Sequence, residues 1–430
     1  MSRSQRLVFL LVDGISTATL ETLLDNGQLP TMARLRKEGA YHGNVVASFP
    51  TVSGPAHVPL LTGVRPTSID LIGHNQFVRS EGRLENYLLH YRLLDRKLAK
   101  HDSLYKHFND SVSVGEPVRV GAKAYRKNLF SLADWARIKG PANGYVLRTV
   151  VHEYRRGRDL IVAWLHETDG LAHRSPRRAN IAESLARLDH WLARFLREID
   201  ENTLVLLTSD HGMEWTNTQQ FVVPKALAAA GLARQRYRYF LDGGAFCQIY
   251  LKSNGNYVAR QDEQVVGSLA AKLTCHPEID LMAYRRANAE DYATVVLNAR
   301  GRAVITKAGA LYRYFVESGQ DPLRYLDGPK GGDISSGLPA EDCHLATATS
   351  AYPDGFYQLY ELLNAASSGD LILTAASGIS FNALTRYAVH GGLQRGQSVT
   401  FVLANKPFSQ GQTEPCLRTS DLPRLIGVLD

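Results

Sequence analysis

Cysteine is scarce in this sequence and its apolar runs are short. The 430 residues include only four cysteines, and no two of them form a CxxC pair. A disulfide framework or a thiolate zinc site is therefore not indicated, and the pattern is typical of a reducing compartment. No apolar run approaches the roughly 20 residues that a transmembrane helix needs. Because the apolar run 7–12 is too short for a signal-peptide core, we expect a cytoplasmic protein without a membrane partner.

Other absences exclude further classes of protein. No GxGxxG segment follows the first predicted strand, which argues against a dinucleotide-binding dehydrogenase. The sequence has no internal repeat, and its hydrophobic share of 44% and charged share of 21% are ordinary for a globular protein. Its length suits a large α/β enzyme with an insertion. The net charge of +7 favours anionic partners, although a basic surface that serves solubility explains the charge equally well.

Buried strands and amphipathic helices alternate over the first half of the sequence. Residues 7–12, 160–165 and 204–207 are continuous apolar runs ended by polar residues, which is typical of buried parallel strands. Residues 181–199 carry apolar side chains at helical spacing. This alternation predicts an α/β fold with a mostly parallel central sheet sandwiched by helices. In such sheets, ligands bind at the carboxyl ends of the strands.

The pattern changes after residue 213. Residues 246–251 and 303–306 indicate shorter strands separated by turns, and the α/β pattern returns at residues 371–374. We therefore predict one core made of residues 1–213 and 371–430. A smaller α+β region, residues 214–370, is expected to interrupt this core and to determine which substrate is bound.

Potential metal ligands and nucleophiles follow the predicted strands. They are Asp13, Ser53, Asp169, His173, Asp210, His211 and His390. Each has an ordinary explanation when taken alone, because an Asp after a strand often caps a helix or forms a turn. Together they would place three carboxylates and three imidazoles beside one edge of the sheet. Mixed oxygen and nitrogen donors suit zinc or manganese, and two such ions can hold the attacking and leaving oxygens of an in-line displacement.

Five short motifs follow one another along the chain in a recognisable order. They are Val12-Asp13-Gly14, the stretch 50–57 with Leu61-Thr62-Gly63 after it, Thr168-Asp169-Gly-Leu-Ala-His173, Ser209-Asp210-His211-Gly212 and His390-Gly391. In this order they resemble the alkaline phosphatase superfamily, and most of all its type I phosphodiesterase/nucleotide pyrophosphatase branch. The resemblance covers the predicted core at both ends of the chain, roughly half of the sequence. It implies an alkaline phosphatase-like fold and a metal-dependent hydrolase of phosphoric esters.

The resemblance also implies two metal sites. The family pattern assigns one ion to Asp13, Ser53, Asp210 and His211, and the second ion to Asp169, His173 and His390. Both ions are zinc in most relatives, with manganese in the mutase-like ones. The implied reaction is a double displacement in which a serine is phosphorylated and then hydrolysed.

The choice of nucleophile depends on a short motif. In the phosphodiesterase relatives the nucleophile stands two residues before a proline, and here that position is Ser53 in Ser53-Gly54-Pro55. Thr51 is the alternative, because a Pro-Thr pair occurs in relatives. Ser53 has an ordinary role as the cap of a helix predicted from residue 56. That role is compatible with catalysis, since a helix N-terminus also favours an incoming phosphate.

Further residues are implied to contact the substrate. The Gly54 backbone N–H and a side chain from His74-Asn75 are candidates, and we assign a catalytic contact to Asn75. Here the sequence departs from the family, because the phosphate-contacting Asn of the relatives aligns with His74, and their Asn after the motif proline is Ala56. Two cations, Lys123 and Arg126, fall where some monoesterase relatives bind phosphate. A solvated basic face explains these two cations as well.

We therefore expect a two-metal phosphoric ester hydrolase acting through a phosphoserine on a small anionic ester, nucleotide-like or a phosphosugar. The choice between monoester and diester stays open, as does the oligomeric state. A phosphonate hydrolase, which His390-Gly-Gly-Leu also resembles, and a phosphosugar mutase are alternatives on the same chemistry. A non-catalytic basic nucleic-acid-binding protein is disfavoured because every ligand position is filled. No nucleic-acid partner is expected.

Overall fold

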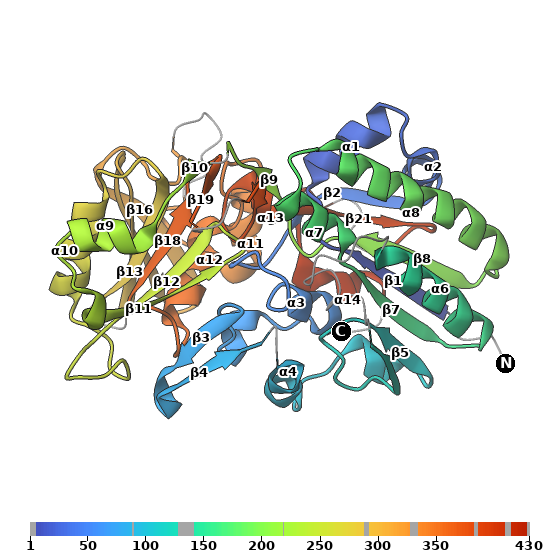
Figure 1. Cartoon of the computed structure of the whole chain (residues 1–430), viewed down its shortest axis with the longest axis horizontal. Helices are drawn as coiled ribbons and strands as arrows, with labels where there is room; N and C mark the ends of the chain where they lie inside the picture. Colours follow the sequence, from blue (N-terminus) through green and yellow to red (C-terminus); the bar gives the residue numbers. More distant parts are fainter. Residues whose placement is uncertain are drawn as a thin grey trace.

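The computed structural model describes residues 6–87, 90–127, 142–217, 219–287, 292–326, 334–381, 386–408 and 414–427. Two eight-stranded sheets lie side by side, as Figure 1 shows. The first sheet has the order β22 (Leu417–Arg418), β2 (Ala40–Val46), β21 (Val399–Ala404), β8 (Thr203–Thr208), β1 (Arg6–Val12), β7 (Leu160–Leu165), β5 (Ser111–Val114) and β6 (Ala124–Arg126). The five strands from β8 to β6 are parallel, and β21 runs antiparallel to its neighbours. The prediction of a mostly parallel central sheet is confirmed.

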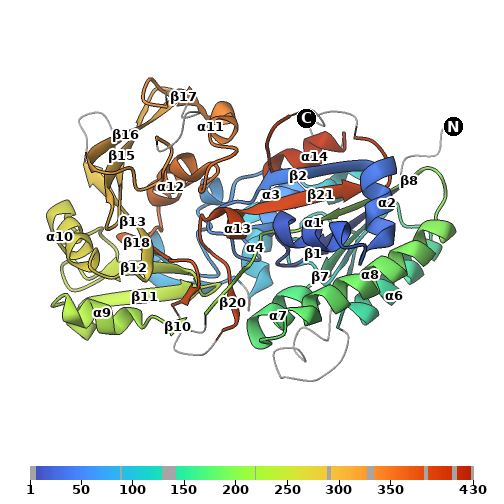
Figure 2. The ribbon, with the colours of Figure 1, turned by 90° about the horizontal axis from the view of Figure 1, so that it is seen from above.

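Helices cover both faces of the first sheet, because its central strands are apolar on both sides. Alternate residues of β1 enter two different cores: Val8, Leu10 and Val12 lie in one, and Leu7, Phe9 and Leu11 lie in the other. The first core is covered by α1 (Thr17–Asp25), α2 (Pro30–Glu38), α6 (Ala142–Arg155), α7 (Glu167–Arg174) and α8 (Ala179–Glu198). The second is covered by α3 (His57–Thr62), α4 (Tyr91–Leu98) and α14 (Leu422–Leu425). Figure 2 shows these two helical layers on opposite faces of the sheet.

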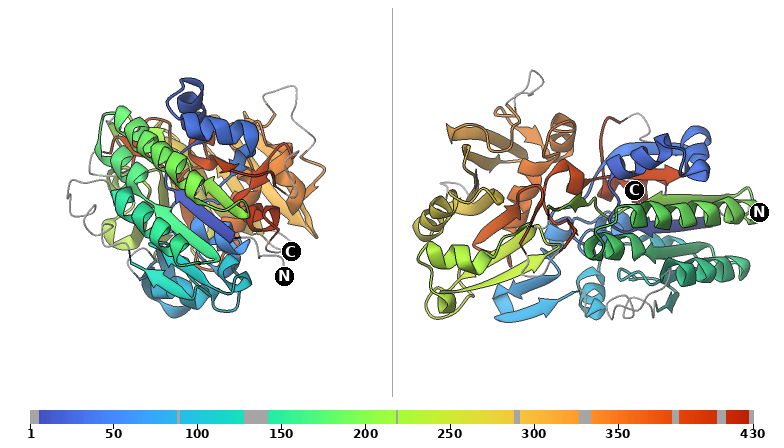
Figure 3. Two further views of the ribbon diagram at one scale, coloured as in Figure 1. Left: turned by 90° about the vertical axis from the view of Figure 1, so that its right-hand side faces the viewer. Right: turned by 45° about the horizontal axis from the view of Figure 1, so that its top comes forward.

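The second sheet is antiparallel where the first is mostly parallel. Its order is β11 (Tyr237–Asp242), β12 (Phe246–Leu251), β18 (Leu371–Ala375), β13 (Ile279–Ala287), β14 (Tyr292–Leu297), β15 (Gly301–Ala308), β16 (Leu311–Gly319) and β17 (Leu338–Pro339). One face packs against α9 (Val223–Ala229) and α10 (Glu263–Leu273), and the other against α11 (Ala340–Ala346) and α12 (Gly355–Asn364). The two views of Figure 3 show that each sheet keeps its own helices.

The boundary of the inserted region differs from our prediction. Residues 371–374 were assigned to the core, but β18 pairs antiparallel with β12 and β13 in the second sheet. A short run of apolar residues buried on both faces has the same pattern in either sheet, so the sequence alone does not assign it. The return to the first sheet comes later, at β21.

Short two-stranded ribbons connect the two sheets near the carboxyl ends of the first one. They pair β9 (Glu214–Trp215) with β20 (Ala388–Val389), β10 (Gln219–Gln220) with β19 (Ile379–Ser380), and β3 (Asn75–Val78) with β4 (Arg83–Asn86). The short helix α13 (Arg395–Ser398) leads from this region into β21. No helix in the described part of the chain is long and apolar enough to cross a membrane.

Candidate active site

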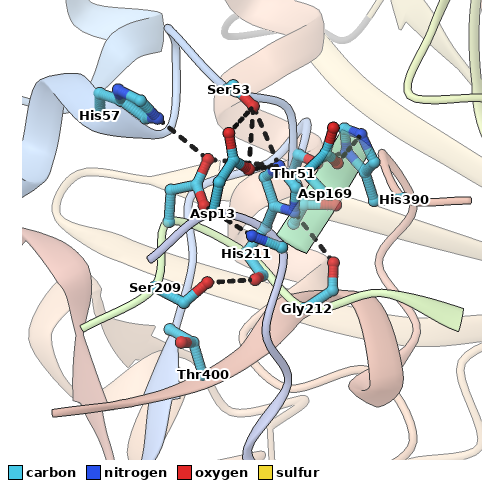
Figure 4. A network of polar contacts seen from close by, with 12 residues as sticks. Asp13, Thr51, Ser53, His57, Asp169, Ser209, His211, Gly212, His390 and Thr400 are labelled. Atoms are coloured by element: carbon cyan, nitrogen blue, oxygen red, sulfur yellow. Dashed lines mark hydrogen bonds and ion pairs between the residues drawn. The ribbon is translucent and has the colours of Figure 1, made fainter. Parts of the chain in front are cut away.

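The predicted ligands meet at the carboxyl edge of the first sheet. Asp13 directly follows β1, and Asp210 and His211 follow β8, its parallel neighbour. Asp169 lies in the first turns of α7, which follows β7 on the other side of β1. His390 follows β20 and reaches the same place from the far end of the chain. In Figure 4, the side chains of Asp13, Asp169, His211 and His390 lie close together below the Ser53 hydroxyl.

Ser53 lies at the centre of this cluster, in the loop between β2 and α3. Its Oγ is 3.4 Å from each carboxylate oxygen of Asp13 and 3.3 Å from Nε2 of His211. The hydroxyl of Thr51 is used differently, because it donates to the carbonyl of Gly392 at 2.9 Å and accepts the Gly391 N–H at 3.0 Å. Of the two candidate nucleophiles, only Ser53 presents its hydroxyl to the ligand cluster.

The imidazoles of His173 and His390 present lone pairs to Asp169. Nδ1 of His173 lies 2.7 Å from the Ala388 carbonyl, and Nδ1 of His390 lies 2.7 Å from the Thr51 carbonyl. A carbonyl only accepts, so each Nδ1 carries the proton and each Nε2 keeps a lone pair. The two Nε2 atoms are 3.2 Å apart, and they lie 3.2 Å and 3.4 Å from Oδ1 of Asp169. Within the described ranges, no residue satisfies that buried oxygen with a hydrogen bond.

His211 repeats this arrangement beside Ser53. Its Nδ1 donates to the Gly212 carbonyl at 2.9 Å, which leaves the lone pair on Nε2. Nε2 lies 3.5 Å from Oδ1 of Asp13 and 3.2 Å from Oδ2 of Asp210. The ring of His211 stacks on the ring of His390 with centroids 3.9 Å apart. The donors around Ser53 and the donors around Asp169 are therefore direct neighbours.

Burial and mutual repulsion shape the electrostatics of the carboxylates. Burial raises the pKa of Asp13 well above its usual range, and the neighbouring Asp210 and Asp169 raise it further. Burial lowers the pKa of His390, which is the direction expected for a neutral metal-ligating imidazole.

This donor set fits divalent metal ions. Lone pairs of His173 and His390 converge with an unsatisfied carboxylate oxygen at contact distance, and facing acceptors of this kind need a cation or a proton between them. Oxygen and nitrogen donors from carboxylates and imidazoles are those preferred by zinc and manganese. The donor atoms of Asp169, His211 and His390 lie within 4.8 Å of one another, and so do those of Asp13, His57 and Asp210.

Two buried residues beside the site, His57 and Glu116, have no role in our sequence analysis. His57 begins α3, and its ring lies between Glu116 and Asp210, with 3.0 Å from Nδ1 to Glu116 Oε1 and 3.0 Å from Nε2 to Asp210 Oδ2. The sequence signal was present in part, because His57 falls four residues after Ser53. Glu116 carried no signal, since only the fold brings the loop after β5 to this place.

The nucleophile loop leaves its backbone donors available beside Ser53. Among the hydrogen bonds of the described residues, none is donated by the N–H of Ser53 or Gly54. Gly54 has φ +83°, a left-handed conformation that glycine adopts freely, and only His74 lies within 4 Å of the position of a Cβ there. The His74 ring contacts the Ser53 carbonyl through Nε2. Two N–H groups are therefore available to bind phosphate oxygens beside the hydroxyl.

The inserted region contributes Asp242, another residue that sequence analysis missed. Asp242 ends β11, and its carboxylate accepts the His74 N–H at 3.0 Å and the Asn75 side-chain amide at 3.2 Å. The side-chain oxygen Oδ1 of Asn75 in turn accepts a hydrogen bond from the side-chain amide of Asn86 at 2.6 Å. The amide of Asn75 is therefore held by Asp242 at the border of the site, and the substrate contact assigned to Asn75 stays a prediction.

Arg386 places a cation at the border of the site. The backbone of this segment is fixed, because Tyr387 N donates to the His173 carbonyl at 3.2 Å and Thr216 Oγ1 donates to the Arg386 carbonyl. Burial lowers the pKa of Arg386, whereas the charges of Asp169 and Asp242 raise it. Within the described ranges, its guanidinium forms no ion pair. It is therefore a partly buried cation without a counter-ion among the residues that the structure describes.

Lys123 and Arg126 are not brought to the ligand cluster. The Lys123 N–H contacts the side chain of Ser111, which lies at the amino end of β5, and its own side chain is exposed. Arg126 donates to the buried Glu153 at 2.8 Å, and Glu153 also receives Arg158 at 2.8 Å. This placement favours the alternative reading, in which Lys123 belongs to a basic surface and Arg126 to an ion-pair network.

We expect Arg126→Gln to change stability and to leave the kinetics of the site intact. The variant removes one of the two arginines that neutralise Glu153, whose side chain is 1% exposed. Because Arg158 remains, the free energy of unfolding should fall by only about 1 kcal/mol. Urea unfolding measures this loss, and a rise in KM without a loss of stability would return Arg126 to the substrate site.

Comparison with known proteins agrees with this architecture. Residues 7–300 match the family described as type I phosphodiesterase/nucleotide pyrophosphatase. Phosphonoacetate hydrolase from Sinorhizobium meliloti is similar in structure, with a TM-score of 0.62, 15% identity, and coverage of 99% of this chain and 95% of the hydrolase. Murine ectonucleotide pyrophosphatase/phosphodiesterase 5 gives a TM-score of 0.61 at 14% identity, with coverage of 99% and 96%.

A curated relative is similar over a shorter stretch. GPI ethanolamine phosphate transferase 3 from Schizosaccharomyces pombe is 26% identical over 183 residues, which is 42% of this chain. The match spans only 19% of that relative's length. Since the family match covers more than half of the chain, and the structural neighbours share the alkaline phosphatase-like fold, the chain belongs to the type I phosphodiesterase/nucleotide pyrophosphatase family of phosphoester hydrolases.

Proposed function

We propose that this protein is a two-metal phosphoric ester hydrolase in which Ser53 is the nucleophile and becomes phosphorylated. The observation that carries the proposal is the position of the Ser53 hydroxyl, whose oxygen lies 3.3–3.4 Å from the Asp13 carboxylate and from Nε2 of His211, two of the candidate metal ligands. Asp13, Ser53, Asp210 and His211 would hold one ion. Asp169, His173 and His390 would hold the other, and His211 is also within reach of this group. When bound, the ions would supply Lewis-acid activation of the hydroxyl and of the leaving oxygen.

Different residues would serve as the nucleophile, as donors to the phosphate oxygens and as positioning groups. The Ser53 hydroxyl would lose its proton, attack phosphorus and release the alcohol of the ester, so that a phosphoserine forms. Attack of water on phosphorus would then release phosphate and restore the hydroxyl. Backbone N–H groups of Ser53 and Gly54 would donate to the equatorial oxygens, where charge develops in the transition state. Asp242 would hold Asn75 and His74 beside that position.

A small anionic ester suits the charge around the site. Arg386 has no counter-ion in the described part of the chain, and it lies close enough to Asp169 and Asp242 for both charges to raise its pKa. An arginine binds carboxylate or phosphate oxygens through two parallel hydrogen bonds. We propose that Arg386 contacts a second anionic group or a non-bridging oxygen of the substrate, on the side of the site formed by Asp169.

A substrate panel tests the proposed function. Purified protein is assayed with p-nitrophenyl phosphate, bis-p-nitrophenyl phosphate, nucleoside monophosphates, phosphosugars and a phosphonate, each with added zinc and with added manganese. Release of an alcohol from one ester class, together with phosphate from a monoester or with a phosphate monoester from a diester, supports the hydrolase and identifies the class. Carbon–phosphorus cleavage alone would assign the chain to the phosphonate hydrolases, and isomerisation without phosphate release to the mutases. No turnover of any compound would contradict the proposal.

Replacement of Arg386 by glutamine should weaken substrate binding more than it slows the chemistry. A lost charge-assisted hydrogen bond removes about 1.5–3 kcal/mol, so KM for the best anionic substrate should rise about 10-fold to 100-fold with a small change in kcat. Arg119→Gln is the matched control, because this partly buried arginine pairs with Asp95 at 3.1 Å, outside the ligand cluster. Equal KM values for both variants and the unaltered protein would exclude a substrate contact by Arg386.

A further inference from the structure

A chain of three buried charged groups runs behind the nucleophile. Glu116, His57 and Asp210 all have side chains that are 0% exposed. Nδ1 of His57 lies 3.0 Å from Glu116, and Nε2 lies 3.0 Å from Asp210 Oδ2. Burying charged groups is costly, and apolar residues packed in the same space are often as stable or more so. The chain therefore calls for a reason other than stability.

The surroundings of His57 hold its ring in one orientation. The edge of the ring meets Trp164 with centroids 5.4 Å apart and an interplanar angle of 79°. Trp164 itself donates from Nε1 to Oδ2 of Asp13 at 2.8 Å. On the far side, Glu116 is fixed by the Val118 N–H, which donates to its Oε1 at 2.9 Å. Trp164 thus orients the carboxylate of Asp13, and His57 orients the carboxylate of Asp210.

His57 differs from the predicted ligands in what its two nitrogens face. In His173, His211 and His390, Nδ1 faces a backbone carbonyl and Nε2 is left as a lone pair. In His57, both nitrogens are within hydrogen-bonding distance and geometry of carboxylate oxygens at 3.0 Å, so both are donors and no lone pair is available to a metal ion. The Nε2 atoms of the other three histidines lie 3.2–3.5 Å from carboxylate oxygens but, among the described residues, form no hydrogen bond with them. His57 therefore lies within reach of the donor cluster without being a ligand of it.

The connection to the nucleophile is short. His57 begins α3 only four residues after Ser53, and the His57 N–H donates to the Gly54 carbonyl at 3.2 Å. A shift of the ring would therefore move both Asp210 and the loop that carries the nucleophile. Oδ1 of Asp210 is held separately by the Gly14 N–H at 3.3 Å, so His57 is the side-chain donor to Oδ2.

We infer that Glu116 and His57 are a positioning pair that orients Asp210, and that this pair determines how tightly the metal ion beside Ser53 is bound. The inference rests on the proposed two-metal function. Groups behind a metal ligand typically change metal affinity by about 10-fold to 100-fold when they are removed. The ion at Asp169, His173 and His390 should be affected much less, because none of these residues contacts His57 or Glu116 in the described part of the chain.

The test measures metal binding directly. Zinc stoichiometry and affinity are determined by competition with a chromophoric chelator for the unaltered protein, His57→Asn, Glu116→Gln and the double variant. We expect two zinc ions in the unaltered protein and one site about 10-fold to 100-fold weaker in each single variant. Because Glu116 acts through His57, the double variant should be no weaker than His57→Asn alone. His42→Asn is the matched control, since His42 is a buried histidine that contacts Glu414 and lies outside the ligand cluster.

The outcomes separate the inference from the proposed function. If the unaltered protein binds no metal, the two-metal function itself fails. If it binds two ions, and both single variants keep both affinities while circular dichroism shows a native fold, only the positioning role fails. A His57→Asn protein that does not fold leaves Glu116→Gln, which preserves side-chain volume, to decide between the same two results. Equal weakening by His42→Asn would also overturn the positioning role.

Discussion

Ser53→Ala should abolish ester hydrolysis while leaving the fold and the other proposed metal ligands in place. Ser53 is buried, with 8% exposed, but the substitution removes only its single side-chain oxygen atom, so little packing is lost. Every other donor of the site remains. Loss of a nucleophile that forms a covalent intermediate lowers kcat by orders of magnitude, because the remaining groups assist only direct attack by water. We expect a fall of at least about 10³-fold in kcat on the best substrate.

The competing nucleophile sets the control for this experiment. Thr51 uses its hydroxyl to tie the loop at Gly391 and Gly392, so Thr51→Ser should keep most of the activity. Acid quenching during turnover, followed by tandem mass spectrometry, should place the phosphoryl group on Ser53. A phosphoryl group on Thr51, or a Ser53→Ala protein with near-normal kcat, would reassign the nucleophile.

The first sheet was predictable because its strands are unusual. Strand β1 is apolar from Leu7 to Val12, which signals burial on two faces, and Asp13 follows it directly, which places a carboxylate at the edge of the sheet. The same pattern holds for β7 and β8. Since parallel strands present their carboxyl ends together, the convergence of Asp13, Asp169 and Asp210 followed from order along the chain alone.

Other features were not predictable because they depend on partners far apart in sequence. β18 is as apolar as the core strands, and only its antiparallel pairing with β12 and β13 assigns it to the second sheet. Glu116 and Asp242 reach the site from loops or strands without a recognisable motif. Arg126 has the residue type and position expected of a phosphate ligand, yet a carboxylate in a neighbouring helix binds it. A charged residue in a sequence predicts a partner of opposite charge, but not whether that partner is a substrate or another side chain of the protein.

Removal of metal should be the second large effect, and it should change both activity and stability. Asp13 and Asp210 are buried and Asp169 is partly buried. Burial raises the pKa of Asp13, and repulsion from Asp210 and Asp169 raises it further. Bound cations relieve that repulsion and contribute several kcal/mol to the transition state, so dialysis against a chelator should lower kcat at least about 10³-fold. Added zinc or manganese should restore it.

Thermal unfolding of the chelated and reloaded protein measures metal binding at the site independently of catalysis. A metal ion that binds only the folded chain stabilises it by about 4 kcal/mol when its free concentration is a thousand times its dissociation constant. Calorimetric melting of the chelated protein should therefore show a Tm several degrees below that of the reloaded protein. His390→Ala should reduce this difference, because one of the converging lone pairs is lost. A Tm that is indifferent to chelator, together with full activity, would mean that the acidic cluster acts without metal. That result would overturn the mechanism while leaving family membership intact, because the family match stands apart from the metal content.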